Sequence, residues 1–258
     1  MMRIGNYIPT DALRPFIRSF KVIESPEATT NIVLPNTSIA ISLCYKGQVS
    51  YLHTSNQLNL PNSTITGLRK SARVIHYFDE SATVIILFTE MGAKAFFDHS
   101  VYELFEGTVS LDNFFQKQDL EILVERLAEA ENNVQKIVTV ENFLLSNLKR
   151  ERNDSLISTA IKKIYASNGS IRIKKMADDL YLSKDAFEKR FRKAVGSSPK
   201  QFSSIVQLKN ITARPLSDSL VRVALNNGFY DQSHFNKCFK VFTGFTPLEF
   251  FKSPDMFC

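Results

Sequence analysis

The sequence lacks the features expected of a secreted or membrane protein. Its three cysteines, Cys44, Cys238 and Cys258, have a spacing that fits neither a metal site nor a disulfide framework. The longest uncharged apolar run, residues 82–89, is far shorter than the roughly 20 residues of a membrane-spanning helix, and the start of the chain has no signal-peptide pattern. We therefore predict a soluble, cytoplasmic protein without a membrane partner.

Signals for catalysis or for a metal are also missing. His53, His76 and His99 lack the paired spacing of a cupin-type metal site, and His234 lies in a helical pattern in which we expect it to pack or cap. The sequence contains no Gly-rich phosphate loop, no nucleophile elbow and no acid pair at a meaningful spacing. We predict no enzyme activity, no cofactor and no metal; a cupin-type enzyme would require a stoichiometric bound ion.

The basic residues are concentrated in the second part of the chain. Residues 151–258 contain 18 Lys and Arg against 10 Asp and Glu, a net charge of +8, whereas residues 1–150 contain 14 against 16, a net charge of −2. Such a basic excess has two explanations: the Lys and Arg side chains are only solvated surface residues, or they bind a polyanionic partner.

This basic part contains an internal repeat. Its copies share a pair of phenylalanines, a glycine, a proline and a further phenylalanine, each displaced by 48 positions, and three upstream apolar residues displaced by 47. The first copy has Phe187, Phe191, Gly196, Pro199 and Phe202, and the second has Phe235, Phe239, Gly244, Pro247 and Phe250. The upstream matches are Ile173, Met176 and Ala177 with Leu220, Val223 and Ala224, so one residue is added near Tyr230.

Each copy has the pattern of two helices joined by a tight turn. Ser183 and Asp231 occupy N-cap positions, and Gly228 suits the left-handed residue that ends a helix. The paired phenylalanines are four residues apart and therefore project from one face of the second helix into a core. This arrangement is the helix-turn-helix, whose second helix enters the DNA major groove.

The run from Gly228 to Phe235 (GFYDQSHF), with Phe239-Lys240 and the TGFTP segment at 243–247, resembles the signature of the AraC/XylS family of bacterial transcription regulators. The resemblance covers about residues 155–252. It implies two helix-turn-helix units joined by a linker helix, an all-α DNA-binding domain for double-stranded DNA, with the two second helices in successive major-groove segments about 34 Å apart.

Geometry and resemblance select the same DNA-contacting residues, which lie opposite the buried phenylalanines. Gln and Asn can pair with adenine, Lys with guanine, and carboxylates with cytosine, whereas outer basic residues contact phosphates. The predicted base-contacting residues are Asp185, Glu188 and Lys189 in the first unit and Gln232, Ser233, Asn236 and Lys237 in the second; the predicted phosphate contacts are Arg192, Lys193 and Lys240.

The sequence departs from the family pattern at three places. Asp185 and Glu188 bring carboxylates toward a polyanion, Pro215 limits the linker helix that starts at Pro199 to about Arg214, and Tyr181 stands where a glycine is frequent. These departures motivate an alternative: a ligand-binding or protein-interaction module with weakened DNA binding.

The first part of the chain, residues 1–150, is predicted to be a small β-barrel or sandwich, and the resemblance implies a cupin-like sensor domain there. Short β-branched and aromatic runs separated by turn formers predict the strands. They span residues 16–23, 32–34, 39–45, 48–53, 63–67, 73–78 and 83–88. The fold class is therefore α+β, with a second domain over residues 151–258 and a short hinge at residues 149–155.

Two amphipathic helices are predicted to end the first domain, after a short helical or loop segment at residues 92–97. Apolar positions from Leu120 to Leu127 and from Val134 to Leu148 define them, with a turn at Asn132-Asn133. Their apolar stripe either packs on its own β-domain or forms a homodimer. A small-molecule effector, and RNA polymerase if the protein is an activator, complete the expected partners.

Overall fold

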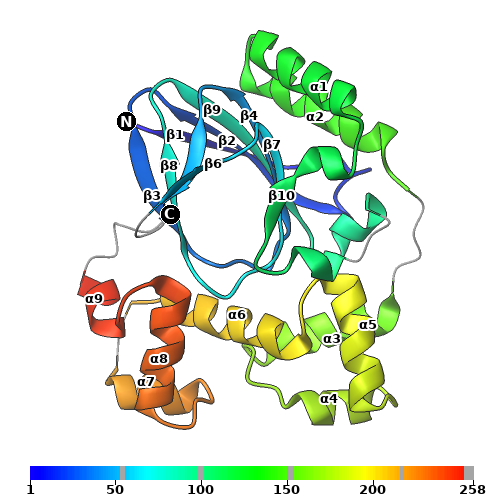
Figure 1. Ribbon diagram of the computed structural model, residues 1–258. Helices are drawn as coiled ribbons and strands as arrows, with labels where there is room; N and C mark the ends of the chain where they lie inside the picture. Colours follow the sequence, from blue (N-terminus) through cyan, green and yellow to red (C-terminus); the bar gives the residue numbers. More distant parts are fainter. Residues whose placement is uncertain (53–55, 98–100, 150–153, 216–217, 253–258) are drawn as a thin grey trace. The chain divides into compact units, whose positions relative to one another are not determined.

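The computed structural model describes residues 1–52, 56–97, 101–149, 154–215 and 218–252 (Figure 1). The chain divides into two compact units. The first comprises residues 1–31, 38–67 and 74–152, and the second comprises residues 32–37, 68–73 and 153–258. Two loop segments from the first half are thus grouped with the helices. Arg69 joins these segments because its guanidinium donates to the carbonyl oxygens of Val33 at 2.7 Å and Leu34 at 3.1 Å.

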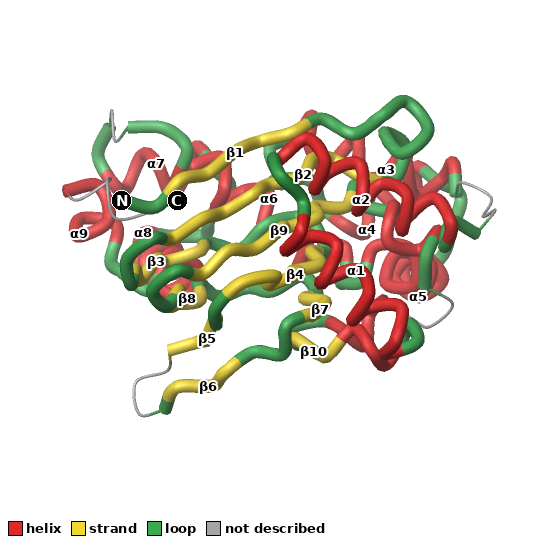
Figure 2. Tube along the Cα trace, turned by 90° about the horizontal axis from the view of Figure 1, so that it is seen from above, coloured by secondary structure: helices red, strands yellow, loops and turns green. Residues whose placement is uncertain are grey.

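The first unit is built on two antiparallel sheets, and Figure 2 shows their strands side by side. All seven predicted strands are confirmed, whereas β1, β6 and β10 were not predicted. One sheet has the order β1 (Arg3–Tyr7), β2 (Ile17–Ser25), β9 (Ser81–Phe88), β4 (Ala40–Lys46), β7 (Ser63–Thr66) and β10 (Thr108–Ser110). The other has the order β3 (Thr29–Val33), β8 (Arg73–Tyr77), β5 (Val49–Leu52) and β6 (Gln57–Asn59).

The core of this unit lies between the two sheets. Ile23 and Cys44 from the first sheet form one buried cluster with Val49 and Tyr77 from the second. Such a core requires each strand to alternate inward apolar and outward side chains, as in a β-sandwich. The predicted N-terminal β-domain is therefore confirmed.

Short 3-10 turns, η1 (Gly92–Ala95), η2 (Val101–Leu104) and η3 (Leu111–Asn113), lead to the predicted helix pair, α1 (Lys117–Glu129) and α2 (Asn133–Ser146). The side chain of Asn132 caps α2 by accepting a hydrogen bond from the N–H of Gln135 at 3.0 Å. The apolar residues of α2 fall into two stripes. Ile137, Val140 and Leu144 are buried, as are Leu120, Leu123 and Leu127 of α1, whereas Val134, Val138 and Leu145 are exposed by 65%, 50% and 42%.

The helices of the second unit follow the predicted repeat. They are α3 (Ser155–Ala166), α4 (Ile173–Asp179), α5 (Lys184–Val195), α6 (Pro199–Thr212), α7 (Leu220–Asn226), α8 (Gln232–Thr243) and α9 (Pro247–Lys252). The predicted linker helix is α6, which ends two residues before Arg214. Of the predicted hinge at 149–155, residues 150–153 lie outside the described residues.

The repeat extends to the backbone details that end one helix and begin the next. Gly196 ends α5 at φ +83°, and Gly244 ends α8 at φ +88°, the left-handed conformation that favours glycine. Reciprocal capping boxes then open α6 and α9, formed by Ser198 with Gln201 and by Thr246 with Glu249. The second capping box lies 48 positions after the first, so each copy of the repeat turns from its phenylalanine-bearing helix into the next helix in the same way.

Asp154 joins α3 to α5 through a charged cap. Its carboxylate accepts hydrogen bonds from the N–H of Ile157 at 3.1 Å and from Nε of Arg190 at 2.5 Å. Burial alone would raise the pKa of Asp154, but these hydrogen bonds and the charge of Arg190 outweigh it and lower the pKa below its usual value. A carboxyl whose pKa is lower in the folded state stabilises that state above its unfolded pKa.

We expect Asp154→Asn to lower the free energy of unfolding at neutral pH by roughly 0.5–1 kcal/mol. The asparagine side chain can still accept the N-cap hydrogen bond, but it loses the partly solvent-screened ion pair with Arg190. The deficit should shrink as the pH falls from about 4, the ordinary pKa of an aspartate in the unfolded chain, through the lower pKa that Asp154 has in the folded state. Urea unfolding followed by far-UV circular dichroism at several pH values measures it. A deficit that does not change with pH would show that the charge contributes nothing.

Candidate DNA interface

Buried aromatic rings fix the orientation of α5 and α8. Phe187 and Phe191 of α5 are fully buried with ring centroids 5.8 Å apart, and Phe191 meets Phe202 of α6 at 5.6 Å. In the second copy, Phe235 and Phe239 of α8 are equally buried at 5.4 Å, and Phe239 meets Phe250 of α9 at 5.3 Å. Because each helix buries the same face, each presents the same opposite face to solvent.

The turns that lead into α5 and α8 match each other by hydrogen bonding. Tyr181 at φ +55° and Gly228 at φ +79° each donate a backbone N–H to the carbonyl three residues before, at 3.0 Å. The left-handed conformation predicted for Gly228 is therefore confirmed, and Tyr181 adopts a positive φ at the position where a glycine is frequent. The predicted N-caps are confirmed too, since the Ser183 and Asp231 side chains accept hydrogen bonds from the N–H groups of Ala186 at 3.2 Å and His234 at 2.7 Å.

The structure separates the ten predicted contact residues into two groups. A first group, centred opposite the phenylalanines, is exposed; a second group lies at the edge of the buried face and is half-buried. The exposed group consists of Asp185, Lys189, Lys193, Ser233, Lys237 and Lys240. The half-buried group consists of Glu188, Arg192, Gln232 and Asn236.

Asn236 is less accessible than the helical pattern predicted. We expected its side chain to point outward, yet the residue is half-buried, and its Oδ1 is buried without a hydrogen-bond partner among the described residues. The reason is geometric: Asn236 follows Phe235 by one residue, about 100° around the helix, and so borders the packed face. Pairing with adenine uses both ends of the amide, so this side chain must rotate to contact a base.

Glu188 occupies the equivalent position in the first copy, 48 residues earlier, and is held by its own helix. Its carboxylate lies 3.8 Å from Nζ of Lys184 and 3.4 Å from a terminal guanidinium nitrogen of Arg192. These pairs are one helical turn before and after Glu188, the spacing at which side chains on a helix meet. They offset the charge of Glu188, so the exposed Asp185 is the carboxylate that would repel a polyanion more strongly.

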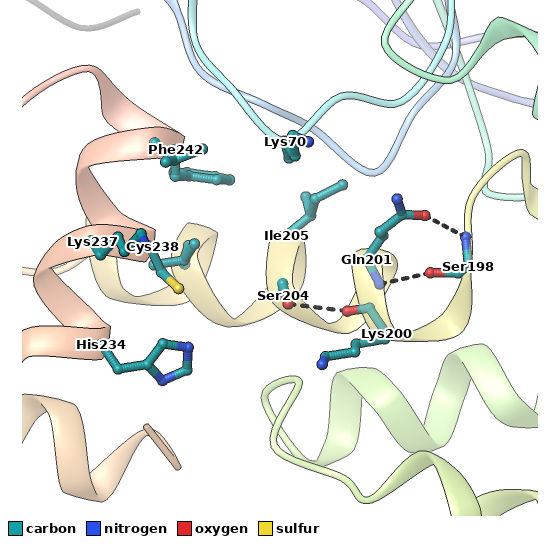
Figure 3. A pocket seen from close by; sticks show the side chains of 12 residues that line it. Lys70, Ser198, Lys200, Gln201, Ser204, Ile205, His234, Lys237, Cys238 and Phe242 are labelled. Carbon is teal, nitrogen blue, oxygen red and sulfur yellow. Dashed lines mark hydrogen bonds between the residues drawn. The ribbon is translucent and has the colours of Figure 1, made fainter. Parts of the chain in front are cut away.

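One flank of α8 lines a cavity of ≈620 Å³ within the second unit (Figure 3). Ile205 of α6 and Phe242 of α8 form part of its apolar wall, while Lys200 and Lys237 also line it. Burial raises the pKa of the Cys238 thiol in this cavity, and the nearby Lys237 and Lys200 lower it by less. Cys238 is thus a protonated, weakly nucleophilic thiol at neutral pH. Sequence patterns did not predict this cavity, because it depends on how α6 packs near α8.

The histidines, which were the other candidates for metal binding or catalysis, do not form a common site among the described residues. His234 packs its ring against Phe229 at 5.6 Å, which confirms the packing role expected of it, and His76 hydrogen-bonds Thr30 at 2.9 Å. His53 and His99 lie outside the described residues. Within the described ranges, no group of three or more His, Cys, Asp or Glu side chains is arranged to hold a metal ion, and no helix is long and apolar enough to cross a bilayer.

Two helix-turn-helix modules, each with a capped second helix and a polar outer face, have the architecture of a double helix-turn-helix domain. The family model described as "Helix-turn-helix domain" matches residues 176–253. The HTH-type transcriptional regulator MtrA of Neisseria gonorrhoeae is 27% identical over 137 residues, which are 52% of this chain and 42% of MtrA. The matched residues run from α4 of the first module through α6 to the end of the second module. These matches show a helix-turn-helix domain over residues 176–253 and similarity to an HTH-type transcriptional regulator, of whose length this chain spans less than half.

Comparison with solved structures gives similarities of low score. Apo ToxT from Vibrio cholerae, a single-residue variant, covers 100% of this chain and 98% of its own length, with 11% identity and a TM-score of 0.47. A regulator with an AraC-type DNA-binding domain from Chromobacterium violaceum covers 38% of this chain and 91% of its own, with 20% identity and a TM-score of 0.35.

Proposed function

We propose that the whole chain is a sequence-specific transcription regulator that inserts α5 and α8 into successive major-groove segments on one face of double-stranded DNA. The duplicated recognition helix supports this most directly: each copy has the same buried phenylalanine pair and the same exposed face. The excess positive charge of residues 151–258 would release counterions from the phosphates and supply a sequence-independent part of the affinity.

In the second module, the exposed Ser233 and Lys237 are the residues that would contact bases without rearrangement. Gln232 and Asn236 lie at the edge of the same face and would contact bases after side-chain rotation. Lys240, one turn beyond Asn236, would bind a phosphate. Because lysine pairs with guanine and the two amides with adenine, this helix favours a mixed sequence of purines on the contacted strand.

In the first module, Lys189 is the exposed counterpart of Lys237 and would be the main base contact. Asp185 is exposed beside it and would select cytosine, whose amino group donates to a carboxylate, while repelling other contacts. Glu188 would first have to leave Lys184 and Arg192. Arg192 and Lys193 would bind phosphates. This module therefore contributes more to selectivity than to affinity.

Selection of DNA fragments from a genomic library by the purified full-length protein tests the proposal. We expect recovery of fragments that share a motif. The binding constant should fall steeply with salt, since log K decreases by about 0.9 per contacted phosphate for each tenfold increase in salt concentration. Binding to no fragment at low salt would contradict the proposal and favour the alternative of a ligand-binding or protein-interaction module.

We also propose that the first unit regulates the second by binding a small molecule and by forming a homodimer through α2. The exposed stripe of Val134, Val138 and Leu145 supports the dimer, because these residues share one helix face beside a groove of ≈430 Å³. Val138→Glu should shift sedimentation from dimer to monomer, whereas Gln57→Glu, which adds the same charge on the exposed strand β6, should not. A wild-type protein that sediments as a monomer at high concentration would rule out the dimer.

A further inference from the structure

Two tyrosines beside the recognition helices are almost fully exposed. In the described part of the chain, the most exposed large apolar side chains are Met1 at 97%, Tyr181 at 97% and Tyr230 at 87%. Tyr181 precedes the N-cap of α5 by two residues, and Tyr230 directly precedes the N-cap of α8. Neither phenol has a hydrogen-bond partner among the described residues. A tyrosine with both its ring and its hydroxyl in water contributes little to folding.

The two tyrosines do not descend from one position of the repeat. By its hydrogen bonding, Tyr181 corresponds to Gly228, and Leu182 corresponds to Phe229, whose N–H groups donate to Ala177 and Ala224 at 3.0 Å. Tyr230 is therefore the residue added in the second copy. Each module thus has an exposed tyrosine in the turn just before its second helix, and the two arise from different changes in sequence. Duplication alone does not explain this coincidence, whereas a shared contact does.

Tyr181 also has a conformational cost. It adopts φ +55°, which glycine tolerates and bulky residues rarely adopt. Its exposed ring gains nothing within the protein that offsets this cost. The N-terminus of a DNA-bound recognition helix lies near phosphates, and the phenolic O–H of tyrosine is one of the donors that bind phosphate oxygens.

We propose that Tyr181 and Tyr230 each donate a hydrogen bond to a DNA phosphate at the edge of the groove that the adjacent helix enters. The two contacts position the two modules on the backbone without reading sequence. This inference rests on the proposed DNA-binding function. The two tyrosine hydroxyls are uncharged phosphate donors, in addition to the basic side chains that bind phosphates. They hold the modules in place without releasing further counterions.

Tyr181→Phe and Tyr230→Phe, which remove only the hydroxyls, test the inference. Each should weaken binding to a wild-type-selected fragment and to a random-sequence duplex equally, by about 10-fold, because a hydrogen bond to a charged acceptor is lost. The slope of log K against log salt should stay unchanged, since no charge is removed. Tyr7→Phe, in β1 of the first unit, is the control and should bind as the wild type does.

Tyr181→Gly gives a second readout, independent of the hydroxyl variants. It should raise the melting temperature by roughly 2–5 °C by relieving the positive φ, while weakening DNA binding at least as much as Tyr181→Phe. Unchanged affinity in both Phe variants, or a loss confined to the selected fragment, would overturn the phosphate contact. Failure of the wild-type protein to bind either DNA would instead refute the proposed function itself, and this inference with it.

Discussion

Replacing Phe239 by alanine is expected to unfold the second helix-turn-helix module and to abolish specific DNA binding. The ring is fully buried and contacts Phe235 at 5.4 Å, Phe250 at 5.3 Å and Phe251 at 5.8 Å between centroids. Truncating such a side chain costs about 3–5 kcal/mol, because the apolar contacts are lost and a cavity remains. Short helices such as α7 and α9 have little stability of their own.

The loss should be local, and hydrogen exchange measures it by segment. Amides of α7, α8 and α9 should lose protection in Phe239→Ala, while those of β2 and β9 in the first unit should keep theirs. Phe239→Leu, which retains most of the volume, should cost less than about 1.5 kcal/mol. Phe191→Ala, the equivalent change in the first copy, should unprotect α5 instead. Full protection of α8 in Phe239→Ala would contradict the assigned core.

Replacing Asn236 and Lys237 together by alanine is expected to remove most of the sequence selectivity of the second module. Each lost base contact should cost roughly 1–3 kcal/mol, so the pair should cost about 2–6 kcal/mol on a selected fragment. Binding to random-sequence DNA should fall much less. The ratio of specific to non-specific binding is therefore the quantity to measure.

This double variant separates recognition from folding. The buried Oδ1 of Asn236 has no hydrogen-bond partner in the described part of the chain, and removing an unsatisfied buried acceptor costs no hydrogen bond. Lys237 is exposed. The melting temperature should therefore be unchanged or higher. Lys240→Ala is the matched phosphate variant: it should weaken both DNAs equally and reduce the salt slope by about 0.9. An unchanged specificity ratio in the double variant would exclude these two residues from base recognition.

The sequence predicted the helical modules well, because their signals are local. The phenylalanine spacing, the caps at Ser183 and Asp231 and the glycine at 228 each act within one or two helical turns, so the pattern determines the structure. Of the missed strands, β6 and β10 have only three residues each, and Gln57–Asn59 of β6 is exposed throughout. Their pairing depends on neighbouring strands, and a short polar segment carries little signal of it.

The candidate site was less predictable than the fold around it. A helical wheel separates an inner face from an outer face but cannot place the boundary, so it did not predict that Asn236 and Glu188 are half-buried. Nor does a sequence show that residues 32–37 and 68–73 group with the helices, because this depends on packing between distant segments. The near-complete exposure of Tyr181 and Tyr230 could not be predicted from the sequence, because it depends on how the turns pack.

The central claim is that α5 and α8 occupy successive turns of the same DNA face. Hydroxyl-radical footprinting of the full-length protein on a selected fragment tests it most directly. We expect two protected patches whose centres lie about 10 base pairs apart on one face, with Asn236→Ala/Lys237→Ala weakening only the patch of the second module. A single patch, or two patches on opposite faces of the duplex, would contradict it.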